Sequence, residues 1–227
     1  YEAALQNLEL AGQLLPDSPL VYYYRARLHL AQGNAEAALT DAERANQLDL
    51  TLLPVYLTLG EAHQANGQYV ESIEPLEIYE RFAQPPEPRV YALLGKAYLQ
   101  SGEEEKALRV FDEALRLDRL NFEVVMERGK LYFERGDAEA ALSDFNRALT
   151  IRPRSFEAAL WRSRALLALD AYGDAYFQLN KIEGDAVSPE RKAQLYYWRA
   201  ISLEPLNVRA AINEWQRLLA LGEEVVP

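Results

Sequence analysis

The sequence predicts an all-α fold in which antiparallel helix pairs stack into a solenoid. The first observation is that sequence markers return every 34 or 35 residues along the chain. The second is that apolar residues inside each period recur at i, i+3, i+4 and i+7, the spacing of an amphipathic helix. No segment shows the alternation that is typical of a strand. Because helices of about 13 residues are marginal alone, their stability must come from stacking.

A glycine that ends the first helix of each repeat is the clearest marker. The intervals between Gly33, Gly67, Gly102, Gly136 and the equivalent Asp170 are 34, 35, 34 and 34 residues. We expect these residues to adopt the left-handed conformation that terminates a helix. Small residues mark the second helix of each copy, at Ala4, Ala38, Ser72, Ala107, Ala141, Ala175 and Ala211.

Short fragments repeat at the end of the first helix. They read Leu-Gly-Glu-Ala-His at 59–63, Leu-Gly-Lys-Ala-Tyr at 94–98 and Arg-Gly-Lys-Leu-Tyr at 128–132. With the later small and large apolar sites, this pattern resembles the tetratricopeptide repeat (TPR) family over essentially the whole chain. The match is most specific at 88–155, where two consecutive copies run without a gap.

The resemblance implies a right-handed superhelical solenoid that forms a single domain over residues 1–227. Residues 1–18 are expected to be the second helix of a partial repeat, and this helix can cover the first full repeat. Six repeats are expected to follow, at residues 19–52, 53–87, 88–121, 122–155, 156–191 and 192–222.

Two of these repeats depart from the pattern. In repeat 53–87, Pro75 should bend the second helix unless it falls within the first turn. Residues 84–88 lengthen the link that follows by one residue, which indicates either a local loop variation or a change in superhelical curvature. In repeat 192–222, the final helix carries apolar Ile212 and Trp215. We expect either that the natural protein continues past Pro227 or that another molecule covers this face.

Composition excludes several function classes. The 227 residues contain no cysteine, which excludes a disulfide scaffold, a thiolate metal site and a thiol nucleophile. A net charge of −11 argues against non-specific binding of nucleic acid, and no apolar stretch could span a membrane. His29 and His63 occupy the repeat site where Tyr98 and Tyr132 stand later, so packing explains them. No phosphate loop, metal-ligand spacing or nucleophile elbow occurs, so we predict no enzyme, no cofactor and no metal.

The first helix of each repeat carries the candidate binding surface. By the resemblance, positions 2, 5, 9 and 12 of this helix line the concave groove that holds peptides. Position 9 is basic in four of five copies of this acidic chain: Arg27, Glu61, Lys96, Lys130 and Arg164. The candidate groove residues are Tyr23, Arg27, Arg89, Lys96, Met126, Lys130, Phe133, Leu160, Arg164 and Tyr196.

These groove residues suit a peptide that carries acidic and hydrophobic side chains. The alternative is that the basic residues pair with neighbouring glutamates, which would keep the groove soluble. Some family members clamp a C-terminal carboxylate with lysine and asparagine, a combination that the matching sites here lack. A second set of basic residues lies at position 7, at Arg25, Arg128 and Arg162. We expect these arginines to form pairs between repeats or to hold their charged heads at the surface.

The sequence therefore predicts a scaffold that binds a protein or peptide partner in its groove, and the basic residues of position 9 suit an acidic partner. A regulatory or substrate-presenting arm of a larger protein, and a module that self-associates through the C-terminal repeat, are the alternatives. A chain without cysteine or an apolar span fits the cytoplasm, and an exported bacterial protein fits almost as well.

Overall fold

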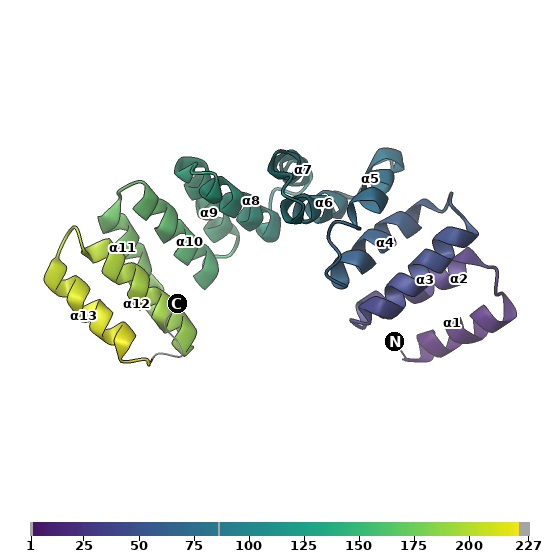
Figure 1. The fold of residues 1–227 in the computed structure, drawn as a ribbon, viewed down its shortest axis with the longest axis horizontal. Helices are drawn as coiled ribbons and strands as arrows, with labels where there is room; N and C mark the ends of the chain where they lie inside the picture. The colour runs from purple at the N-terminus through teal and green to yellow at the C-terminus, as the bar shows by residue number, and fades with distance from the viewer. Residues whose placement is uncertain (1, 86, 223–227) are drawn as a thin grey trace. The chain divides into compact units, whose positions relative to one another are not determined.

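In the computed structural model, residues 2–85 and 87–222 are described, and every regular element within them is a helix (Figure 1). Their contacts divide the chain into two compact units, residues 1–119 and 120–227. In each unit, helices that follow one another in the chain pack side by side, so each unit is a stack of helix pairs. The prediction of an all-α solenoid is confirmed.

The first unit contains one lone helix and three helix pairs. The pairs are α2 with α3, α4 with α5 and α6 with α7, and the first helices also pack on one another, α2 on α4 and α4 on α6. The bounds are α1 Glu2–Leu14, α2 Pro19–Ala31, α3 Ala35–Leu48, α4 Leu53–Ala65, α5 Ile73–Phe82, α6 Pro88–Gln100 and α7 Glu104–Leu117.

The second unit contains three further pairs. Its first helices, α8, α10 and α12, again pack on one another in order. The bounds are α8 Phe122–Glu134, α9 Ala138–Ile151, α10 Phe156–Ala168, α11 Tyr172–Lys181, the short 3-10 helix η1 Glu183–Asp185, α12 Pro189–Leu203 and α13 Val208–Leu219. Because α12 begins at Pro189, a repeat boundary between 191 and 192 runs through its first turn. The repeat boundaries and the single domain stay predictions.

The turn between the two helices of a pair is built as the sequence predicts. The four marker glycines, at 33, 67, 102 and 136, have φ between 74° and 82°, and Asp170 has φ 57°. A left-handed residue costs glycine little, whereas Asp170 accepts it as one of the few side chains that tolerate this region. The left-handed helix end is therefore confirmed at all five sites.

Close approach of the two helices in a pair depends on a second glycine. Gly95 in α6 lies against the ring of Phe111 in α7, and Phe111 is fully buried. A methyl group on Gly95 would lie within 2.6 Å of three ring carbons. The side chain of residue 95 must therefore be absent for the ring to occupy this place.

The arginines at position 7 pair inside their own repeats, so the expectation of surface heads is wrong. Nε and Nη2 of Arg128 donate to the two carboxylate oxygens of Asp144, at 2.8 and 2.7 Å, and this carboxylate is 3% exposed. Arg25 and Asp41 form the same forked pair between α2 and α3. Arg162 also reaches the preceding repeat, through Asn146 Oδ1 at 2.6 Å. A planar guanidinium matches a carboxylate in this geometry.

Pro75 is the third residue of α5 and therefore lies in its first turn. Proline lacks a backbone N–H, but the N–H groups of the first turn of a helix have no acceptor within the helix. Pro75 therefore removes no hydrogen bond of α5 and does not bend the helix. Instead, residues 69–72 form turns, and α5 begins only at Ile73. This late start shortens α5 to 10 residues, against 14 in α3 and α7.

The terminal helices differ in how well they are covered. Leu5 and Leu8 of α1 are half-buried against the first unit, while Leu14 and Leu15 are exposed. On α13, Leu218 is buried, but Ile212 and Leu219 are 49% and 72% exposed. No described helix is long and apolar enough to cross a membrane.

Candidate peptide-binding faces

The predicted groove residues divide between the two units, and each unit presents its own first-helix face. Tyr23, Arg27, Arg89 and Lys96 belong to α2 and α6 of the first unit. The other six belong to the second unit: Met126, Lys130, Phe133, Leu160, Arg164 and Tyr196.

In the first unit, Arg89 pairs with one half-buried carboxylate, that of Glu61. Nη2 of Arg89 lies 2.6 Å from Oε1 of Glu61. Burial raises the pKa of Glu61, and the charges of Arg89 and Arg27 oppose this shift. Arg27 also donates to the Tyr23 hydroxyl at 3.3 Å. The pairing of basic residues with glutamates, which the sequence offered as the alternative, therefore holds on this face for Arg89 and Glu61. Lys96 is half-buried on α6.

In the second unit, Lys130 is held in the same manner. Its Nζ lies 3.0 Å from Glu127 on its own helix and 2.8 Å from Glu157 on α10. Burial disfavours the charged form of Lys130, but hydrogen bonds to Glu157 and Glu127 outweigh it and raise its pKa. An incoming acidic group would have to compete with two carboxylates that are already in place. Lys130 is therefore a poor primary contact for an anion.

Arg164, the other position-9 residue of the second unit, has aromatic rings around it in place of carboxylates. Its guanidinium carbon lies 3.8 Å from the ring centre of Trp161, 5.0 Å from that of Trp198 and 5.2 Å from that of Phe133. Its Nε is buried without a hydrogen-bond partner, and within the described residues no carboxylate forms an ion pair with Arg164. Burial lowers its pKa, and the charge of Glu134 partly opposes this shift. The result is a charge held by aromatic rings with donor capacity still unused.

Two predicted groove residues lie in the core, so these predictions are wrong for direct contact with a peptide. Met126 is 2% exposed and Leu160 is 7% exposed. Leu160 packs in a cluster with Phe156 and Leu179, because neighbouring helices cover position 5 of α10. Tyr196 is half-buried, and its ring is approached by Arg217 of α13, with the guanidinium carbon 6.0 Å from the ring centre.

Sequence reasoning missed the two tryptophans that frame Arg164. Trp161 precedes Arg164 by three residues, which places both on one side of a helix. The contact between Trp161 and Arg164 could therefore have been predicted from the sequence. Trp198 comes from α12, in the repeat whose register departs from the pattern, so its approach to Arg164 could not be read from spacing.

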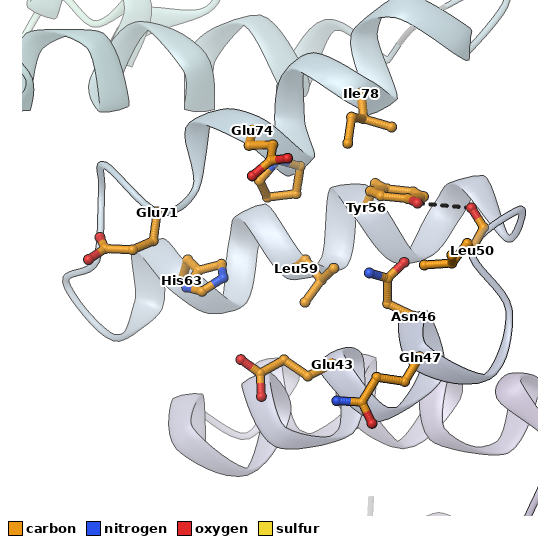
Figure 2. Close-up of a pocket in the computed structure, with 11 residues that line it drawn as sticks. Glu43, Asn46, Gln47, Leu50, Tyr56, Leu59, His63, Glu71, Glu74 and Ile78 are labelled. Carbon is orange, nitrogen blue, oxygen red and sulfur yellow. Dashed lines mark hydrogen bonds between the residues drawn. The ribbon is translucent and has the colours of Figure 1, made fainter.

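A hollow of about 580 Å³ opens on another side of the first unit, between α3, α4 and α5 (Figure 2). It lies where α5 begins late, and His63, Glu43 and Glu74 line it. Nδ1 of His63 is 2.9 Å from Oε1 of Gln68, which fits a packing role for the imidazole. Within residues 2–85 and 87–222, no group of three or more histidine or carboxylate side chains could hold a metal ion.

Comparison with known proteins decides the family. Tetratricopeptide repeat profiles match residues 57–122, 92–155 and 126–185 in overlapping segments, and a further one matches 19–44. Together these matches cover more than half of the chain. The chain belongs to the tetratricopeptide repeat family. A curated relative, small glutamine-rich tetratricopeptide repeat-containing protein 2 of Mycosarcoma maydis, is 32% identical over 74 residues, which are 33% of this chain and 21% of the relative. The match therefore spans about a fifth of the relative's length.

Solved structures show the same fold at low identity. The C-terminal part of a TPR repeat-containing protein from Cytophaga hutchinsonii aligns with a TM-score of 0.77 at 20% identity, over 99% of this TPR chain and 93% of that one. YrrB, described as a TPR protein with an unusual peptide-binding site, aligns with a TM-score of 0.66 at 17% identity, over 92% and 97%. MamA aligns with a TM-score of 0.67 at 22% identity, over 75% and 93%. The fold and these relatives support a protein-interaction scaffold.

Proposed function

We propose that this TPR chain binds an acidic segment of a protein partner on the first-helix face of its second unit, with Arg164 as the principal contact. The observation that carries the proposal is a cationic side chain that forms no ion pair with a carboxylate among the described residues and is framed by Trp161, Trp198 and Phe133. The aromatic rings would contact apolar side chains of the same segment. The peptide-binding site named for YrrB is consistent with such a role.

The face is suited to selectivity for acids. A guanidinium can give two parallel hydrogen bonds to a carboxylate, and partial burial strengthens them. Lys130 contributes less, because an incoming carboxylate would displace Glu127 or Glu157 from it. The specificity of this face would therefore depend on one arginine, although both of its position-9 residues, Lys130 and Arg164, are basic.

A positional-scanning library of dodecapeptides tests the proposal. We expect the chain to select Asp or Glu at one fixed position beside an apolar residue, and Arg164→Gln to lose that selection. Arg209→Gln, at an exposed arginine of α13, is the matched control, and circular dichroism checks that each variant folds. Selection of the same peptides by Arg164→Gln would remove Arg164 from the site. No selection by the wild type would reject the function itself.

Self-association is the second candidate, and the exposure of Ile212 and Leu219 on α13 favours it. A second copy could cover these side chains. Sedimentation velocity at rising concentration should then show a dimer in the wild type and a monomer for Ile212→Glu. A monomer in both would reject this candidate without bearing on Arg164.

A further inference from the structure

Three arginines surround a second hollow, which the proposed peptide contact does not use. This hollow has a volume of about 690 Å³ and lies in the second unit, around the link between α9 and α10. Arg152 and Arg154 come from that link, and Arg191 comes from the first turn of α12. The apolar part of its wall is formed by Phe122, Pro153 and Phe156.

Aromatic rings hold two of these arginines in place. The guanidinium carbon of Arg152 lies 4.1 Å from the ring centre of Phe122, and that of Arg191 lies 5.2 Å from the ring centre of Phe156. Both rings are largely buried, so they form fixed platforms. A guanidinium that rests on a ring still has its N–H groups for an anion, because the ring occupies only its face.

The positive charge of this hollow is not balanced from within. In the part of the chain that the structure describes, no ion pair joins a carboxylate to Arg152, Arg154 or Arg191. Glu157 also lines the hollow, but its carboxylate pairs with Lys130 at 2.8 Å. Arg191 additionally donates to the backbone oxygen of Asp185 at 3.3 Å, which uses one of its five N–H groups. Three positive charges with free donors therefore meet in a chain of net charge −11.

We infer that this hollow binds the phosphate group of a phosphorylated serine or threonine in a protein partner. A phosphate monoester carries a charge of about −1.5 to −2 and three strong acceptor oxygens, which matches three arginines better than a single carboxylate does. The apolar wall fits a residue beside the phosphorylated one. We assign the phosphate to a protein partner because the chain is proposed to act as a protein-interaction scaffold. The inference therefore rests on that proposed function, but it does not depend on Arg164.

Fluorescence anisotropy with three labelled peptides provides the test. The peptides are Gly-Leu-Xaa-Leu-Gly with blocked ends, in which Xaa is phosphoserine, serine or glutamate. At fixed ionic strength, we expect the phosphoserine peptide to bind most tightly and inorganic phosphate to compete with it. Arg154→Gln, which removes a donor without taking a guanidinium from an aromatic ring, should weaken binding roughly tenfold. Arg209→Gln should leave the binding unchanged.

Each other result overturns the inference. Equal affinity for the phosphoserine and serine peptides would mean that the hollow does not recognise phosphate. Equal affinity for the phosphoserine and glutamate peptides would mean that any acid suffices. Equal loss in Arg154→Gln and Arg209→Gln would mean that only the net charge acts. Loss of phosphopeptide binding in Arg164→Gln, with Arg154→Gln unaffected, would place the phosphate at the first-helix face, and the peptide-binding proposal would stand while this one fell.

Discussion

Adding one methyl group at Gly95 should destabilise the first unit, because the ring of Phe111 occupies the space that the group needs. Three ring carbons would lie within 2.6 Å of the new carbon. Phe111 is fully buried between α6 and α7, so its ring has no solvent-exposed position to move to. The helices must therefore separate, or the ring must leave its rotamer.

The size of the effect follows from two opposed contributions. Overpacking of this kind costs up to about 3 kcal/mol. Replacing glycine by alanine inside a helix returns about 1 kcal/mol of intrinsic helix propensity. The expected net loss for Gly95→Ala is therefore about 2 kcal/mol. At Gly173 in α11, a methyl group would meet no atom within 4 Å, so Gly173→Ala should gain about 0.5 kcal/mol.

Urea unfolding, followed by circular dichroism, gives the midpoint of unfolding for each variant. We compare midpoints because a repeat array need not unfold in a two-state manner. The midpoint of Gly95→Ala should fall and that of Gly173→Ala should rise. Adding Phe111→Leu to Gly95→Ala should cost less than Phe111→Leu does alone, since the clash disappears with the ring. Equal midpoints for the two glycine variants, or strictly additive effects of Gly95→Ala and Phe111→Leu, would refute the reasoning.

Three further predictions concern charged groups. Asp144→Asn should lower stability by about 3 kcal/mol, because Arg128 would lose a buried anionic partner. Glu103→Gln, at the exposed pair with Lys106, should leave stability nearly unchanged, and urea midpoints compare the two variants. Peptide binding to the Arg164 face should weaken as salt rises from 50 to about 500 mM, and an affinity independent of salt would show apolar contact alone. Glu61→Gln should stabilise the chain more at pH 7 than at pH 4, as melting temperatures would show.

The fold was predictable because the six repeats could be compared with one another within a single sequence. A left-handed turn residue at each period and a glycine opposite Phe111 are local requirements, and they are visible in the residue types. The position-7 arginines were predictable as a series but not as buried pairs. The aspartate partners of Arg25 and Arg128 lie 16 residues later, on the second helix, and that separation has meaning only once the helix pair is formed.

The candidate site was less predictable for a different reason. The sequence shows that position 9 is basic, but it does not show which bases are already neutralised. Lys130 and Arg164 look alike in the repeat, yet Lys130 has two carboxylate partners and Arg164 has three aromatic rings. Part of this difference arises from side chains on neighbouring helices, Glu157 beside Lys130 and Trp198 and Phe133 beside Arg164. The same limit explains why Met126 and Leu160 were placed on a surface although they are buried.

Glu61 is the acidic residue among the five position-9 residues, and its burial disfavours the charged form of its carboxyl group. Burial raises that pKa above the ordinary value of about 4.5, and Arg89 only partly offsets the shift. A group whose pKa is raised by folding stabilises the folded state fully below its unfolded pKa, and this contribution is lost as the pH rises through the folded pKa. Glutamine is neutral at both pH values, so Glu61→Gln avoids the loss. A melting temperature for Glu61→Gln that falls further below wild type at pH 7 than at pH 4 would mean that the attraction of Arg89 exceeds the cost of burial.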